Sequence, residues 1–285
     1  MLDSAIIIIT CSDQAGIVAA VTGFIHDNNG NIIDLEQHVD IEQSQFYMRI
    51  EWDFSKFIID KASINASFKD SIADSFNMNF NIYFSTDTPK LALFVSKHSH
   101  CFYDMLSRYQ SGEWRVAIPV IISNHRDLEK PAKDLDIPYH YIPITKENKL
   151  SQEQKILDIL KDNNINLIVL ARYMQILSEN FITQYKNKII NIHHSFLPAF
   201  PGAKPYHSAY ERGVKIIGAT SHYVTADLDA GPIIAQDIEH VSHTDSIKEL
   251  IRKGSDIEKI VLARAIWKHI NHKTLVYNNR TIIFT

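Results

Sequence analysis

The chain has 285 residues, a length that suits about two ordinary domains. Apolar residues make up 45% and charged residues 22% of it, which is typical of a globular protein with a sizeable core. The net charge of −4 and the absence of any run of basic residues argue against nucleic-acid binding, which requires clustered Lys and Arg.

No segment predicts a membrane span or a secretory signal. The apolar run that begins at Ala5 is short, and Asp3 stands before it where a signal would carry basic residues. The two cysteines, Cys11 and Cys101, have neither metal-binding nor redox spacing. Because free cysteines are usual in reducing compartments, we expect a cytoplasmic protein that does not bind membranes.

Residues 1–86 are predicted to form a first domain with the element order βαββαβ. Ser12 or Asp13 is expected to cap its first helix, because both side chains accept hydrogen bonds from free backbone N–H groups. The expected strands are 5–10, 31–41, 45–53 and 78–84, and the expected helices run from near 16 to a break at 28–30 and over 56–76. This order is typical of a ferredoxin-like sandwich.

Two stretches of this segment, TCSDQAGIVAAVTGFI and NNGNIIDLEQH, resemble an ACT domain, a regulatory module that binds small molecules. The resemblance implies an amino acid effector near the start of the first helix, where backbone N–H groups can receive a carboxylate. A helix cap at Asp13 and a turn at Gly16 explain those two residues equally well without a ligand. The effector-binding residues that the resemblance implies are Asp13, Gly16, Ile17, Asn31 and Ile32.

Residues 90–285 are predicted to form a second domain after a short linker at 85–90. Its strands alternate with helices, which predicts a doubly wound, mostly parallel, Rossmann-like α/β sheet. Ser246 and Glu249 have the spacing of a capping box that opens a long helical region. The expected strands are 91–96, 116–123, 139–142, 167–170, a run ending near 191, 214–224, 275–277 and 281–284, and the clearest helices are 100–110, 151–162 and 246–272.

The first turn of this sheet, residues 96–100, contains no glycine. Nucleotide and phosphate sites need glycine there, because the backbone must approach the phosphate closely. We therefore predict neither a nucleotide cofactor nor a phosphorylated substrate at this turn. His98 and His100 raise the question of a metal, but no acidic or Cys partner stands at ligand spacing, so no metal is predicted.

Polar side chains gather at the ends of two predicted strands, where open α/β sheets place ligands. Asn191 and His193 are two residues apart, so they face the same side of a strand and can both donate to one carbonyl oxygen. Asp229, in the turn after the next strand, could favour protonated His193 and position a water. Each residue also has a structural alternative: a strand-end cap, a core histidine or an Asx turn. His194 faces the other way, and Ser195 lies in no nucleophile pattern.

The stretch INIHHSFLPAFPGAKPYH and the later LDAGP resemble the folate-dependent formyltransferases. The resemblance implies that Asn191, His193 and Asp229 are catalytic. It also implies that LARYMQILS lines a pterin pocket through the backbone of Gln175, Ile176 and Leu177, with Val224 and Asp227 on a loop that closes the other side.

VSKHSHC, together with His194 where transferases usually have Pro, is similar to the branch of that family that hydrolyses 10-formyltetrahydrofolate to formate and tetrahydrofolate. That branch supplies formate for purine synthesis, uses water as acceptor, and needs no metal or other cofactor. The pairing with an ACT domain implies methionine and glycine as possible effectors, and a homo-oligomer. The alternatives are formyl transfer to an amine acceptor and a non-catalytic amino-acid or folate sensor.

Overall fold

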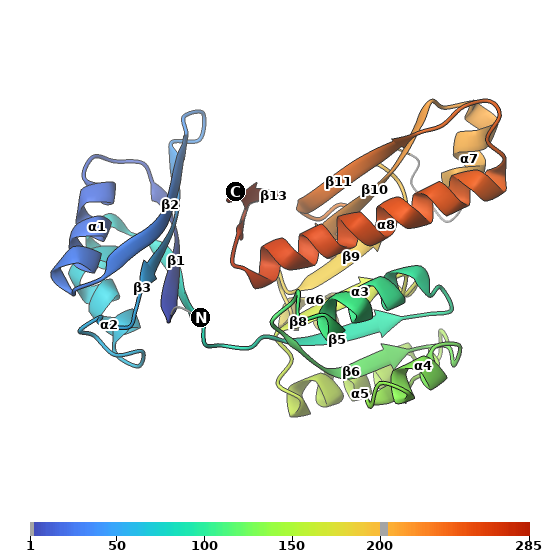
Figure 1. Ribbon diagram of the computed structural model, residues 1–285, viewed down its shortest axis with the longest axis horizontal. Helices are drawn as coiled ribbons and strands as arrows, with labels where there is room; N and C mark the ends of the chain where they lie inside the picture. The colour runs from blue at the N-terminus through green and yellow to red at the C-terminus, as the bar shows by residue number, and fades with distance from the viewer. Residues whose placement is uncertain (1–2, 200–204) are drawn as a thin grey trace. The chain divides into compact units, whose positions relative to one another are not determined.

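Figure 1 shows the computed structural model, which describes residues 3–199 and 205–285. The chain divides into two compact units, with the boundary between Thr88 and Pro89. The last three residues, predicted within the second domain, belong to the first unit. Phe284 is buried there, and the backbone N and Oγ1 of Thr285 donate to Glu36 Oε2 at 2.8 and 2.9 Å.

The first unit has the predicted order βαββαβ. Its antiparallel sheet has the strand order β2-β3-β1-β4, so the first and third strands are central, and a buried apolar cluster fills the space under the helices. The elements are β1 (Ser4–Ser12), α1 (Ile17–Asp27), β2 (Asn31–Asp40), β3 (Gln45–Asp53), α2 (Ile64–Phe68), continued by η1 (Lys69–Ala73) and η2 (Asp74–Phe76), and β4 (Asn79–Phe84). The ferredoxin-like prediction is confirmed.

The second helix of this unit begins later than predicted. The apolar spacing predicted a helix from residue 56, whereas the helix starts at Ile64. Asp60 Oδ1 accepts hydrogen bonds from the backbone N of Ala62 and Ser63 at 2.9 and 2.8 Å. Because the Asp60 side chain binds these two N–H groups in a turn, the helix begins only after them.

The predicted cap of α1 was wrong. Gly16 precedes the helix with φ of 94°, and no side chain caps it. Ser12 is still part of β1, and the backbone N of Asp13 donates to Ser44 O at 2.9 Å. The chain needs a left-handed residue between strand and helix, and glycine adopts that conformation without a Cβ penalty.

The second unit is a seven-stranded sheet of order β11-β10-β9-β8-β5-β6-β7. Strands β5 to β9 are parallel, and β10 runs antiparallel to both β9 and β11. The elements are β5 (Lys90–Val95), α3 (His100–Gln110), β6 (Ala117–Ser123), α4 (Glu129–Lys133), β7 (Tyr139–Tyr141), α5 (Lys149–Asp162), β8 (Leu167–Ala171), α6 (Glu179–Gln184), β9 (Ile189–His193), α7 (Pro205–Arg212), β10 (Ile216–Tyr223), β11 (Ile233–His240), α8 (Ile247–Ile270), β12 (Thr274–Tyr277) and β13 (Arg280–Ile283). The doubly wound prediction is confirmed.

Two helical layers enclose this sheet. Helices α3 and α8 lie together over one face, and α5 and α6 contribute to the buried cluster on the other (Figure 1). The predicted capping box of α8 is present, with Ser246 Oγ accepting from Glu249 N at 3.3 Å. Strand β11 was not predicted, because its sequence turns polar after Ala235 and lacks a clear alternation of apolar residues.

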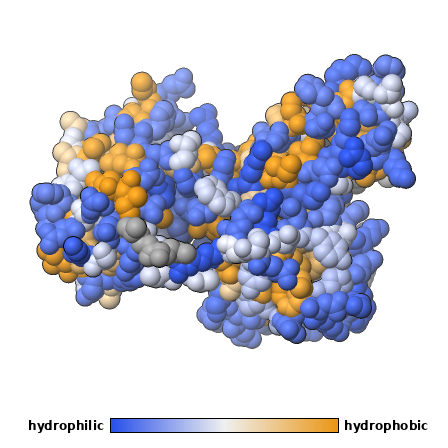
Figure 2. Space-filling view, viewed as in Figure 1, coloured by the Kyte–Doolittle hydropathy of each residue, from blue (hydrophilic) through white to orange (hydrophobic). Residues whose placement is uncertain are grey.

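The carboxyl ends of parallel strands β5, β8 and β9 meet at one edge of the sheet, as ligand-binding α/β sheets require. In the space-filling view, hydrophobic residues form separate patches among hydrophilic ones (Figure 2). Within the described residues, no helix has the length and apolar character to cross a membrane.

Candidate active site

His193, the last residue of β9, forms the centre of the site together with Asp229. Its side chain is 5% exposed, and its Nδ1 lies 3.2 Å from Asp229 Oδ2. Because a carboxylate can only accept, Nδ1 carries the hydrogen and Nε2 is the atom available for chemistry. Nε2 is buried and finds no hydrogen-bond partner among the described residues. A buried ring nitrogen without a protein partner is suited to a reacting atom of a substrate.

Asn191 is held by a histidine that the sequence reasoning missed. His222 lies directly opposite Asn191 in the antiparallel register of β10 with β9, and its Nε2 is 3.3 Å from Asn191 Nδ2. Its Nδ1 is 2.9 Å from the carbonyl of Tyr223, so Nδ1 donates and neutral Nε2 accepts from the Asn191 amide. This contact fixes the orientation of the Asn191 amide, with its NH₂ group towards His222. The only sequence signal was a histidine within the predicted strand 214–224.

The loop that carries Asp229 folds back on β10 because Gly231 has no side chain. A Cβ at Gly231 would lie 1.8 Å from the carbonyl O of Tyr223, and the backbone N of Tyr223 donates to Pro232 O at 2.9 Å. Asp229 itself has φ of 54°, a left-handed conformation that Asp tolerates better than most residues. The sharp return brings the carboxylate beside His193.

Electrostatics keep Asp229 ionised. The hydrogen bond from His193 holds the pKa of the Asp229 carboxyl well below its usual range, although partial burial acts in the opposite direction. The side chain keeps 18% of its surface exposed, so water reaches it. The carboxylate therefore stabilises a positive charge on His193 and offers its second oxygen to a water.

Ser195 takes part in the local structure instead of reacting. Its Oγ donates to Ala199 O at 2.8 Å, and its carbonyl accepts from Thr220 Oγ1 at 2.9 Å. The segment after β9, with a cis peptide bond before Pro198, is therefore fastened to β10. Residues 200–204 of the recognised motif lie outside the described residues.

The residues predicted to bind folate lie on two loops of the second unit. Gln175, Ile176 and Leu177 belong to the segment between β8 and α6, which is neither helix nor strand. Leu177 is buried, Gln175 is half-buried and Ile176 is 62% exposed. Val224 follows β10 and packs against the same apolar cluster as Leu177, whereas Asp227 is exposed. The two loops thus share one apolar base.

The residues predicted to bind an effector do not form one site within a single chain. Asp13 and Gly16 lie between the end of β1 and α1, whereas Asn31 starts β2 and pairs with Asp53 at the opposite end of the sheet. Two further members are packed: Ile17 is 2% exposed, and Ile32 contacts the core of the unit. A shared effector site would need residues from two chains.

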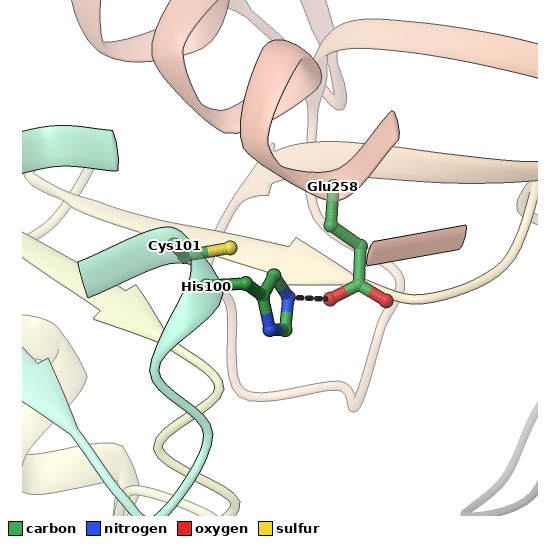
Figure 3. Close-up of side chains that lie close together, drawn as sticks. All are labelled: His100, Cys101 and Glu258. Atoms are coloured by element: carbon green, nitrogen blue, oxygen red, sulfur yellow. Dashed lines mark hydrogen bonds and ion pairs between the residues drawn. The ribbon is translucent and has the colours of Figure 1, made fainter. Parts of the chain in front are cut away.

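The histidines of the first turn have structural partners. His100 Nε2 lies 2.8 Å from Glu258 Oε2, and the ring of His98 lies 6.5 Å from that of His100. His100, Cys101 and Glu258 have potential metal-ligand atoms within 4.8 Å of one another (Figure 3). The sequence reasoning overlooked this acidic partner, because Glu258 is 158 residues away from His100 along the chain. His194 is buried, with its ring 6.0 Å from that of Tyr206.

Known proteins share both units. Residues 89–266 match the family model for formyl transferases, and residues 5–66 match the ACT domain. The formyltetrahydrofolate deformylase of a Synechocystis strain is 52% identical over 99% of this chain and 98% of its own, and that of Bacillus subtilis is 45% identical over 99% and 94%. The crystal structure of a formyltetrahydrofolate deformylase from Pseudomonas syringae matches with 41% identity and a TM-score of 0.98, covering 100% and 95% of the two chains.

A transferase structure matches a smaller share of the chain. Glycinamide ribonucleotide transformylase 1 from Symbiobacterium toebii has 27% identity and a TM-score of 0.66, covering 72% of this chain and 98% of its own. An α/β sheet of this topology, with Asn191, His193 and Asp229 at its edge, thus defines a member of the formyl transferase family that also carries an ACT domain. Within that family the chain belongs to the formyltetrahydrofolate deformylases.

Proposed function

We propose that this chain hydrolyses 10-formyltetrahydrofolate to formate and tetrahydrofolate. The observation that carries the proposal is the pairing of His193 Nδ1 with Asp229 Oδ2 at 3.2 Å, which leaves His193 Nε2 buried and without a partner in the part of the chain that the structure describes. Such a pair would supply a proton donor to a formyl group that Asn191 also binds. The relatives that match end to end carry the name of this activity.

The electrophilic part of the site comes from β9. Asn191, held by His222, donates an amide N–H, and protonated His193 donates Nε2–H to the formyl oxygen. Both donors are aligned before the reaction, so they stabilise the negative charge that develops when the carbon becomes tetrahedral. One donor of this kind lowers the activation free energy by about 3–4 kcal/mol.

The nucleophile is water. Asp229 Oδ1 lies 3.7 Å from His222 Nε2, beyond hydrogen-bonding distance, and so can accept from the attacking water. The water oxygen bonds to the formyl carbon, the bond from carbon to N10 of the folate breaks, and N10 takes the His193 proton. One water proton then restores His193, and the other is released to solvent with formate. The proposed chemistry uses no cofactor and no metal.

The binding partners follow from the same assignment. The loops holding Gln175–Leu177 and Val224–Asp227 would bind the pterin between them, above the apolar base that they share. Methionine and glycine are the proposed effectors of the ACT unit. Strand β2 is an edge strand with exposed Ile33 and Leu35, which supports association of two copies along this edge. Buried, unpaired Cys11 and Cys101 fit a reducing cytoplasm.

Formate release from purified protein tests the proposal. Incubated with 10-formyltetrahydrofolate and no amine, the protein should release formate and tetrahydrofolate in equal amounts. Product formation only after adding glycinamide ribonucleotide or another amine would contradict hydrolysis and favour transfer. Binding of folate without turnover under either condition would favour a sensor. A titration of the same assay with methionine and glycine tests the effectors.

A further inference from the structure

Glu258 on α8 is a buried carboxylate that the proposed chemistry does not use. Its side chain is 0% exposed. Arg172 Nη1 donates to both of its oxygens at 2.9 and 3.1 Å, His100 Nε2 lies 2.8 Å from Oε2, and the hydroxyl of Tyr206 donates to Oε1 at 2.7 Å. Three segments of the second unit, those that carry His100, Arg172 and Tyr206, therefore contact the Glu258 carboxylate. We refer to these four residues as the Glu258 cluster.

The contacts of this cluster do not favour a metal ion, although Cys101 completes a possible ligand set (Figure 3). Both oxygens of Glu258 already accept hydrogen bonds, and the Arg172 guanidinium would repel a cation. Burial raises the pKa of the Cys101 thiol well above its usual value, so the thiolate that a metal needs is disfavoured. The cluster is better described as a closed ion pair.

Glu258 also meets the conditions of a stable fixed charge. Burial by itself raises the pKa of its carboxyl, but the hydrogen bond from His100 and the positive charge of Arg172 outweigh this and lower the pKa to about 2. The long helix α8 carries the carboxylate, and Gly254 on the same face leaves room for the tyrosine: a Cβ there would lie 2.1 Å from the Tyr206 hydroxyl.

Arg172 begins the loop that carries Gln175, Ile176 and Leu177. Arg172 has φ of 61° and Met174 has φ of 58°, left-handed conformations that cost free energy for residues with a Cβ. Such backbone persists only where other contacts hold it. The Arg172 carbonyl accepts from Ser96 Oγ, and its side chain is held by Glu258.

The other end of the loop is fixed in the same manner. The backbone N of Ser178 donates to Glu153 Oε1 at 3.0 Å, and Glu153 is 3% exposed. Between the two ends, Tyr173 is buried against Phe94, with ring centroids 5.1 Å apart. Two buried carboxylates thus hold the ends of a strained loop, with Ile176 left exposed at its centre.

We propose that Glu258 is a positioning residue for folate binding: through Arg172 it holds the loop at 172–178 in the conformation that receives the pterin. This inference rests on the proposed function, because the loop is assigned to folate there. Glu258 acts on substrate binding and contacts neither the formyl group nor water. Its loss should therefore raise KM much more than it lowers kcat.

The test replaces Glu258 with its neutral isostere in the full-length protein. Glu258→Gln should raise KM for 10-formyltetrahydrofolate, and Kd for tetrahydrofolate, by about tenfold or more, while kcat changes less than about threefold. Arg264→Gln is the matched control: Arg264 lies on the same helix as Glu258, and the change breaks only its ion pair with Asp237 on β11, so all three constants should stay unchanged. Circular dichroism and a thermal melt establish that each variant is folded.

A double-variant cycle separates positioning from a general loss of packing. Arg172→Met should raise KM as Glu258→Gln does, and the double variant should be no worse than either single one, because the two residues form one contact. Arg172→Lys, which keeps the charge but loses the guanidinium fork, should give an intermediate KM and serves as the test if Glu258→Gln does not fold. Unchanged KM and Kd in folded variants, or fully additive effects, would overturn the proposal.

These outcomes stay distinct from those of the proposed function. Formate release by the unaltered protein tests hydrolysis, whereas the comparison of variants tests the loop. If the unaltered protein released no formate, Kd for tetrahydrofolate would still report on Glu258. If it released formate and Glu258→Gln bound folate normally, hydrolysis would stand and the role of Glu258 would fall.

Discussion

Asp229 and Glu258 are both carboxylates with depressed pKa values in the second unit, but their surroundings differ. Asp229 lies on a loop and is 18% exposed, and its Oδ1 is 3.7 Å from His222 Nε2, beyond hydrogen-bonding distance. Glu258 lies on a helix, is 0% exposed and accepts through both oxygens. A lowered pKa alone therefore does not identify a catalytic acid. Access to water and an unused lone pair distinguish Asp229, which we propose to be reactive, from Glu258, which we propose to be structural.

The sharpest test of this comparison is Asp229→Asn. The amide can donate to His193 Nδ1 and so favours the wrong tautomer, which should lower kcat on the order of 10⁴-fold. Binding of tetrahydrofolate should be retained, because the folded loops are unchanged. Formate release and folate affinity are measured on the same preparation, with exposed Asp237→Asn as control. Turnover within tenfold of the unaltered protein would remove Asp229 from the mechanism.

Removal of the amide donor should have the next largest effect. Asn191→Ala deletes one donor to the formyl oxygen and should lower kcat by about 10²–10³-fold, with a smaller change in KM. Steady-state formate release gives both constants. A rise in KM alone, at constant kcat, would show that Asn191 binds substrate without stabilising the transition state.

The role of Glu258 as a fixed charge predicts a dependence of stability on pH. Its pKa of about 2 in the folded protein is below the usual 4.5, so its stabilisation is complete above pH 4.5 and is lost as the pH falls from there towards 2. The loss is on the order of 3 kcal/mol. Thermal melts between pH 6 and pH 3 should show the decline, and Glu258→Gln should flatten it. An equal decline in the variant would contradict the assignment.

The smallest effect is expected for His222, which acts through Asn191. His222→Phe keeps the volume but removes the acceptor of the Asn191 amide, and kcat should fall on the order of tenfold, or about 1.4 kcal/mol. His222→Gln, whose side chain reaches the same position, should recover part of that loss. If the two variants were equally active, then packing, and not the hydrogen bond, would account for His222.

The sequence by itself determined the order of elements in the first unit and the alternation of strands and helices in the second, and it singled out the candidate site residues. Strand alternation places Asn191 and His193 on one side, and the motif around Asp229-Ala230-Gly231 marks a turn, because these are properties of neighbouring residues. The capping box of Ser246 and Glu249 at the start of α8 also depends only on residues close together in the sequence. Such features need no knowledge of what packs against them.

Only the tertiary structure decided which distant residues meet. His222 reaches Asn191 through the antiparallel pairing of β10 with β9, and Glu258 reaches Arg172 and His100 across 86 and 158 residues of chain. The start of α2 and the uncapped start of α1 also depended on contacts that compete with local spacing. Sequence patterns report the conformation of a segment, whereas these contacts depend on how segments pack. The role of a buried charge such as Glu258 can therefore be inferred only from the residues that contact it.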